Sequence, residues 1–137
     1  MLSSASRVIF FVGRTFAGRT HDYTMLKTEF PVDEAWFTTT EVLLDLGYQG
    51  VRTDYQGDRI SLPHKKPRKS KKTPDPHLSA EQKRDNRTLA KLRVFIEHAI
   101  GGVKRFRVLV APYRNHKHGF EDDLLVVAAG LWNFWLS

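Results

Sequence analysis

The stretch NRTLAKLRVFIEHAIGGVKRFR, Asn86–Arg107, decides the fold of the second half of this chain. It contains no proline, and its apolar residues recur at the three- and four-residue spacing of an amphipathic helix. The same stretch holds six lysines and arginines but a single carboxylate, that of Glu97. The presence of one acid in so basic a helix requires a physical explanation.

Glu97 shares one side of this helix with two cationic residues. At about 100° per residue, Glu97 lies about 40° and Lys104 about 20° from Arg93, provided that the glycine pair at 101–102 does not break the helix. This charged stripe borders the apolar face. An Arg93–Glu97 ion pair is one explanation of the acid, and such exposed pairs contribute only about 0.3–0.5 kcal/mol. A metal ligand that faces a polyanion is the other, and helix geometry alone favours the ion pair.

Composition limits the class of protein. The chain has 137 residues, 41% of them hydrophobic, which is typical of one globular domain. A net charge of +7 and an isoelectric point near 9.9 favour a nucleic-acid or other polyanionic partner. The absence of cysteine excludes disulfides and thiolate zinc sites. The longest apolar run, Leu124–Leu136, has 13 residues and is too short to span a bilayer, so we expect no membrane partner.

The first half of the chain has the pattern of an α/β protein. Short runs rich in β-branched, leucine and aromatic residues predict strands at Arg7–Phe16, at Val42–Leu44 and, on weaker grounds, at Arg59–Pro63. The second of these runs ends at Asp45, next to a glycine turn. We therefore expect buried sheet strands with a carboxylate at the end of one of them.

Helices are expected around these strands. One should cover Tyr23–Phe30, capped by Thr20 or Asp22 and ended by Pro31, because a residue before proline disfavours the helical conformation. A further helical turn is expected within Val32–Thr40.

The second half of the chain is predicted to be mainly helical. Ser79 and Gln82 have the spacing of a capping box, which starts the long helix and lets it run to about Ile100, where the glycine pair weakens or bends it. The segment Arg107–Asn115 is expected to be short and extended. A last apolar helix should cover Glu121–Leu136, with acids in its first turn.

Residues 64–77, HKKPRKSKKTPDPH, form a basic segment with three prolines and no apolar side chain. It has nothing to bury and predicts a flexible loop within a single partial domain that covers residues 1–137. Its charges would give steeply salt-dependent binding to DNA. The cations concerned are Lys65, Lys66, Arg68, Lys69, Lys71 and Lys72.

The acids at 45 and 97 are suited to cleavage and joining of DNA phosphodiesters. Two divalent ions about 3.5–4 Å apart can activate the attacking oxygen and neutralise the leaving one. Mg²⁺ prefers carboxylate oxygens, and surrounding cations can hold the DNA backbone. Asp45 is the best strand-end acid for this role. An aspartate before a glycine also commonly serves a turn, and the local sequence slightly favours that simpler role.

The segments LLDLGYQG (43–50), GRTHD (18–22) and NRTLAKLRVFIEHAIGGVKRFRVLVAPYRN (86–115) together resemble the DDE transposases of bacterial insertion sequences, the DDE superfamily endonucleases. The resemblance implies that Asp45 is the second catalytic acid and that Glu97 is the catalytic glutamate. Both would be metal ligands for Mg²⁺ or Mn²⁺ in a two-metal site. Arg93 and Lys104 match the spacing of the family helix and would contact DNA phosphates or position the acid.

The resemblance also implies a fold and partners. The fold would be ribonuclease H-like, a mixed sheet flanked by helices. The partners would be transposon ends and target DNA, in the bacterial cytoplasm in association with the nucleoid. His21 and Asp22 would lie in a loop near the active site. A helix-capping role is favoured for this pair over a direct catalytic one.

Two features depart from the family pattern. Ala90 stands where the family helix often has tyrosine. The first catalytic aspartate and about two strands of the family would precede Arg7, where only six residues stand. We therefore expect an N-terminally truncated fold that is inactive or severely impaired alone. It would be either a truncated element or a second reading frame, completed by frameshifting or by the N-terminal half on another chain. An exposed sheet edge would also favour self-association into an oligomer. A non-catalytic basic nucleic-acid-binding protein, a domesticated remnant or an unrelated one, is the alternative function.

Overall fold

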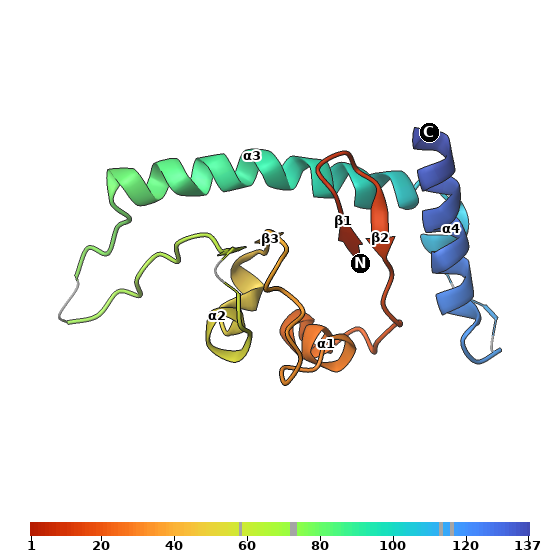
Figure 1. Cartoon of the computed structure of the whole chain (residues 1–137), viewed down its shortest axis with the longest axis horizontal. Helices are drawn as coiled ribbons and strands as arrows, with labels where there is room; N and C mark the ends of the chain where they lie inside the picture. The colour runs from red at the N-terminus through yellow and green to blue at the C-terminus, as the bar shows by residue number, and fades with distance from the viewer. Residues whose placement is uncertain (58, 72–73, 113, 116) are drawn as a thin grey trace. The chain divides into compact units, whose positions relative to one another are not determined.

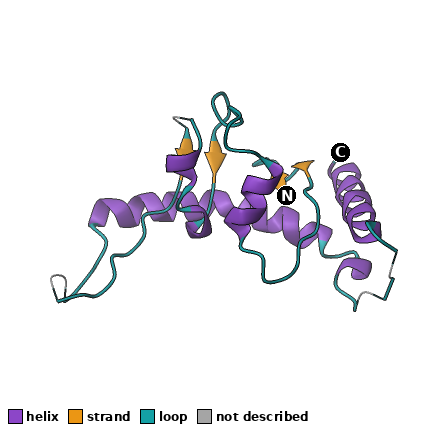
Figure 2. Ribbon diagram, turned by 90° about the horizontal axis from the view of Figure 1, so that it is seen from below, coloured by secondary structure: helices purple, strands orange, loops and turns teal. Residues whose placement is uncertain are grey.

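A computed structural model of the chain describes residues 1–57, 59–71, 74–112, 114–115 and 117–137. The chain, whose helices and strands are drawn in Figures 1 and 2, divides into two compact units. Unit 1 comprises Met1–Ala17 and Leu92–Ser137, and unit 2 comprises Gly18–Lys91. The long helix α3, Ala80–Val103, contributes its first half to unit 2 and its second half to unit 1. Each unit has a hydrophobic core of its own.

Unit 2 is built on a short parallel strand pair. Strand β3, Val42–Leu43, pairs with β4, Ile60–Ser61, and Val42 lies opposite Ile60. Because parallel strands require a crossover connection, the chain passes between them through the 3₁₀ helix η1, Leu46–Tyr48, and the short helix α2, Val51–Asp54. Both strands were predicted from the sequence, whereas α2 was not.

The core of unit 2 gathers apolar side chains from these strands and from the helices beside them. Val51 is completely buried, and Tyr55 and Phe37 are nearly so. The rings of Phe37 and Tyr55 pack at a centroid distance of 5.2 Å, which adds a favourable aromatic contact to the burial of apolar area. The buried members of this core are Leu26, Phe37, Leu44, Val51, Tyr55, Ile60 and Leu62.

Helix α1, Asp22–Glu29, begins one residue earlier than the sequence predicted and has a different cap. The Nδ1 atom of His21 accepts a hydrogen bond from the backbone N–H of Tyr23, so His21 is the N-cap residue rather than Thr20 or Asp22. Imidazole nitrogen replaces the usual cap oxygen, which propensity rules do not anticipate. The prediction that the helix ends before Pro31 is confirmed, because Phe30 is its C-cap.

The helical turn predicted within Val32–Thr40 is wrong. These residues form turns and bends, and Phe37 is their buried anchor. The ring of Trp36 meets Phe30 edge to face at 5.2 Å, and its Nε1 donates to the carbonyl of Pro31. Aromatic contacts in the core therefore determine the path of this segment in place of helical hydrogen bonds.

A polar cluster joins α1 to α2 within unit 2. The hydroxyl of Tyr23 donates to Oδ2 of Asp54 at 2.6 Å, and Nζ of Lys27 donates to the same oxygen at 2.9 Å. These two hydrogen bonds lower the pKa of the Asp54 carboxyl. Burial, followed by the hydrogen bond to Asp54, raises the pKa of Tyr23. The phenol thus stays protonated and keeps donating to the carboxylate.

Unit 1 opens with an antiparallel pair. Strand β1, Leu2–Ser3, pairs with β2, Ile9–Phe11, through a tight turn in which Arg7 has a φ of 70°. The predicted strand over 7–16 is thus reduced to three residues. Instead of one mixed sheet, the described residues form two separate two-stranded sheets.

Helix α4, Phe120–Leu136, holds β2 through side-chain hydrogen bonds. Oδ1 of Asn133 accepts from the N–H of Ile9 at 2.9 Å, and Nδ2 of Asn133 donates to the carbonyl of Ile9 at 2.8 Å. Nε1 of Trp132 donates to the carbonyl of Arg7 at 3.0 Å. The amide of Asn133 therefore satisfies both backbone groups of Ile9, as a neighbouring strand would.

Helix α3 starts at the predicted capping box. The backbone N–H of Ser79 donates to Oε1 of Gln82, and the N–H of Gln82 donates to Oγ of Ser79. The helix does not end near Ile100 but continues through the glycine pair to Val103. The expected extended segment after it is also wrong, because Arg107–Leu109 forms a 3₁₀ helix, η2. The Tyr113 position of that segment lies outside the described residues.

Gly102 explains why the helix passes through the glycine pair. Gly102 is buried, and a Cβ atom there would overlap with the ring of Trp132, itself only 4% exposed. A Cβ at Gly101 would meet no atom within 4 Å. Gly102 is therefore required for the close approach of α3 and α4 within unit 1, and the helical propensity that it costs is offset by packing.

We expect Gly102→Ala to destabilise the protein by about 2 kcal/mol, because the added methyl group forces the Trp132 ring out of its place. The matched control is Gly101→Ala, which should stabilise it by about 0.5–1 kcal/mol through helix propensity alone. Urea unfolding followed by tryptophan fluorescence measures both. Equal and favourable effects of the two substitutions would contradict the proposed packing role of Gly102.

Candidate functional site

Asp45 lies directly after the predicted strand, at the end of β3. The backbone N–H of Leu44 still donates to the carbonyl of Ser61 at 3.0 Å, so the parallel ladder continues to the residue before the acid. Asp45 has extended backbone angles and is the N-cap of η1. Its partly exposed carboxylate thus stands at the carboxyl end of a parallel strand. Open α/β sheets commonly bind ligands at that edge.

The turn after Asp45 fixes its carboxylate. Oδ1 accepts a hydrogen bond from the N–H of Gly47 at 2.7 Å. A Cβ at position 47 would lie only 3.0 Å from this oxygen, so glycine leaves room for the contact. Asp45 therefore performs the turn role that the local sequence favoured. This role occupies one oxygen and does not by itself prevent the other from binding a cation.

Glu97 forms the ion pair that helix geometry favoured. Oε1 of Glu97 lies 3.7 Å from Nη2 of Arg93, and the two side chains are 64% and 38% exposed. An exposed pair of this kind contributes at most a few tenths of a kcal/mol. The second half of α3 buries Ala99 and Val103 on its other side, so Glu97 projects away from the packed face of unit 1.

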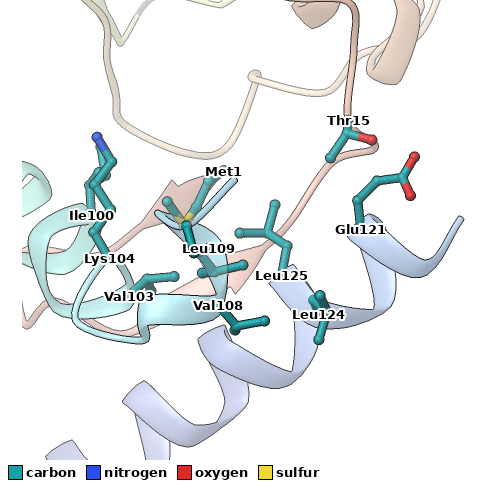
Figure 3. A pocket seen from close by; sticks show the side chains of 11 residues that line it. Met1, Thr15, Ile100, Val103, Lys104, Val108, Leu109, Glu121, Leu124 and Leu125 are labelled. Carbon is teal, nitrogen blue, oxygen red and sulfur yellow. The ribbon is translucent and has the colours of Figure 1, made fainter. Parts of the chain in front are cut away.

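Lys104 follows the last residue of α3, and its backbone N–H still donates to the carbonyl of Ile100 at 3.0 Å. Its angular position beside Arg93 and Glu97 is thus as predicted. In unit 1 it borders an apolar cavity of about 310 Å³, with Lys104 at one side and Glu121 at the other (Figure 3). The rest of the lining is mostly aliphatic and includes Val103, Val108, Leu109, Leu124 and Leu125.

The two candidate acids belong to different units. Asp45 is in unit 2 and Glu97 is in unit 1, so their convergence on one cation stays a prediction. Among the described residues, no group of three or more histidines, aspartates and glutamates is arranged to hold a metal ion. Each acid is a single exposed or partly exposed carboxylate, which is the hard oxygen donor that Mg²⁺ or Mn²⁺ prefers.

Tyr48 lies near two of the candidate site residues, Asp22 and Asp45, and sequence reasoning did not single it out. His21 and Asp22 begin α1, which contacts the η1 turn of Asp45 within unit 2. Burial, then the charge of Asp22 and then that of Asp45, raise the pKa of Tyr48. The negative charges of both carboxylates therefore favour the protonated phenol of Tyr48. An active-site role of His21 and Asp22 remains a prediction, and their visible role is to start α1.

The described part of the basic segment is exposed from Lys65 to Lys71, and Lys72 lies outside the described residues. The first residue of the segment, His64, is attached to α3. Oδ1 of Asn86 accepts from the N–H of His64 at 2.7 Å, and Nδ2 of Asn86 donates to the carbonyl of His64 at 3.0 Å. Nε2 of His64 lies 3.2 Å from Oδ2 of Asp85. Sequence reasoning missed Asn86, because its partner lies 22 residues away.

The geometry of Glu97 predicts how little it contributes to stability. We expect Glu97→Gln to change the free energy of unfolding by less than about 0.5 kcal/mol, because the Arg93 pair is exposed. The matched control on the same helix is Glu81→Gln, and chemical denaturation measures both. A loss well above 1 kcal/mol for Glu97→Gln would show that this acid is kept for the fold.

Comparison with known proteins supplies the family. Residues 1–133 match the family described as DDE superfamily endonuclease. The chain is 33% identical over 122 residues to a probable transposase for insertion sequence element IS702 from Microchaete diplosiphon. That alignment covers 88% of this chain and 39% of the relative. No solved structure matches the chain.

None of the described helices is both long and apolar enough to cross a membrane.

The resemblance inferred from the segments around Asp45 and Glu97 is confirmed by the family match, which includes both acids. This chain belongs to the DDE superfamily endonucleases, and it is similar to an insertion-sequence transposase.

Proposed function

We propose that this chain is the part of an insertion-sequence transposase that supplies Asp45 and Glu97 to a metal-dependent site for cutting and joining DNA. The observation that carries the proposal is the position of Asp45, at the carboxyl end of a parallel strand in a chain that belongs to the DDE superfamily endonucleases. Because the chain spans 39% of the relative's length, the complete reaction is proposed for the whole protein.

The residues at hand fit a divalent cation. When bound, Mg²⁺ or Mn²⁺ would activate the attacking oxygen and stabilise the leaving one. Asp45 would offer a carboxylate already oriented by the N–H of Gly47. Glu97 would offer a second one, and Arg93 beside it would contact a DNA phosphate as the acid turns to the cation. Lys104 would add a further phosphate contact.

Other features of the whole protein follow from the same proposal. Its DNA partners would be the transposon ends and the target, held in part by the cations of the basic segment. The fold would be ribonuclease H-like, completed by the rest of the transposase, and assembly into an oligomer is compatible with this. The compartment would be the bacterial cytoplasm, in association with the nucleoid.

A second candidate function is a non-catalytic nucleic-acid-binding protein. The observation in its favour is that Asp45 and Glu97 both have structural partners, Gly47 and Arg93. In that case the two acids would serve only a turn and a helix pair, and only the cations would matter for binding DNA.

Nicking of supercoiled plasmid in Mg²⁺ separates these functions. We expect this chain alone to be inactive or severely impaired, because two acids leave a pair of metal ions without a bridging carboxylate. Together with the N-terminal part of an IS702-like transposase it should nick DNA. Asp45→Asn and Glu97→Gln should each then reduce the rate at least about 100-fold.

The matched controls are Asp33→Asn in unit 2 and Glu81→Gln on the same helix as Glu97, which remove exposed acids and should leave the rate unchanged. Robust nicking by this chain alone that Glu97→Gln abolishes would contradict the proposed impairment. Nicking by the completed protein that survives both Asp45→Asn and Glu97→Gln would instead favour the second function.

A further inference from the structure

The net positive charge of this chain comes from one continuous segment of unit 2, residues 64–91. Residues 64–91 contain ten lysines and arginines and three carboxylates, which gives the whole net charge of +7. The rest of the chain contains twelve basic and twelve acidic residues. The segment includes both the basic loop and the first half of α3, where Lys83, Arg84, Arg87 and Lys91 are exposed.

Asn86 joins the two parts of this segment. Its side-chain amide makes two hydrogen bonds to the backbone of His64, one through each of its polar atoms. The loop cations start with Lys65, the residue after this contact, and Arg87 follows Asn86 on the helix. The capping box at Ser79 fixes the other end of the loop on the same helix. The contact therefore fixes the start of the loop on α3 within unit 2.

The contact is neutral and independent of the side chain at position 64. It uses only the N–H and carbonyl of His64. The neighbouring His64–Asp85 pair is 40% and 54% exposed, and an exposed pair contributes little. The amide of Asn86 is half-buried and forms the stronger attachment.

We propose that Asn86 is a positioning residue, which holds the loop cations and the helix cations together as one surface for the phosphates of duplex DNA. This inference rests on the proposed action on DNA and assigns to it a surface and a residue that carries no charge. A loop attached before binding loses less conformational entropy when it meets the phosphates. The amide thus increases affinity without adding a charge contact.

Asn86→Ala tests this role, with Asn133→Ala as the matched control. Asn133 makes the same two-bond contact with the backbone of Ile9, but in unit 1. Binding of the full chain to a fluorescent DNA duplex is measured by anisotropy over a range of salt concentrations. Hydrogen exchange of the His64 amide shows directly whether the contact is lost.

We expect Asn86→Ala to weaken binding about 3- to 10-fold at fixed salt and to leave the dependence of log K on log salt unchanged, because no charge is removed. Asn133→Ala should leave binding unchanged. The double variant Lys65→Ala/Lys66→Ala should instead reduce the salt slope by about 2.

Three outcomes would overturn the inference. The first is salt-dependent binding that Asn86→Ala does not alter although the His64 amide exchanges faster. The second is an equal loss for Asn86→Ala and Asn133→Ala, which would show general destabilisation. The third, a wild-type chain without salt-dependent DNA binding, would overturn the proposed DNA function as well and is distinguishable by that result.

Discussion

The continuity of α3 is the constraint on which the rest of the structure depends. Its hydrogen bonds run unbroken from Ala80 to Val103, through two adjacent glycines. On the unit 2 half of α3, Asn86 contacts the first residue of the basic loop, and on the unit 1 half Gly102 packs under Trp132. The burial of Gly102 under Trp132 stabilises the helix where propensity would end it. Packing, rather than local preference, therefore sets its length.

Each of the two candidate acids makes a structural contact, and each is also proposed as a metal ligand. Asp45 caps a turn with one oxygen, and Glu97 pairs loosely with Arg93 on an exposed surface. The exposed Arg93 pair is too weak to account for Glu97 through stability alone, whereas a cap such as that of Asp45 contributes about 0.5–2 kcal/mol. The membership of the chain in the DDE superfamily endonucleases makes the metal role the more informative hypothesis. Under that hypothesis, the simpler roles describe how each carboxylate would be held in the absence of a cation.

The sequence predicted those features that depend on neighbours in the chain. The strand that ends at Asp45, the capping box at Ser79 and the Arg93–Glu97 pair are local patterns, and all are present. Features that depend on distant contacts were missed or misjudged. The glycine at 102 breaks helices on propensity scales but is required here by a ring 30 residues away. The contact of Asn86 with residue 64 has no local signature, and the relation of the two acids across the units stays a prediction.

The most direct test of the proposed site is the binding of Mn²⁺ to the full chain and to the variants Asp45→Asn, Glu97→Gln and the double variant. A cation shared by both acids makes the two losses strongly non-additive, so the double variant should bind Mn²⁺ only slightly more weakly than either single variant. Binding that neither substitution changes, or losses that simply add, would show that the two carboxylates do not meet at one cation.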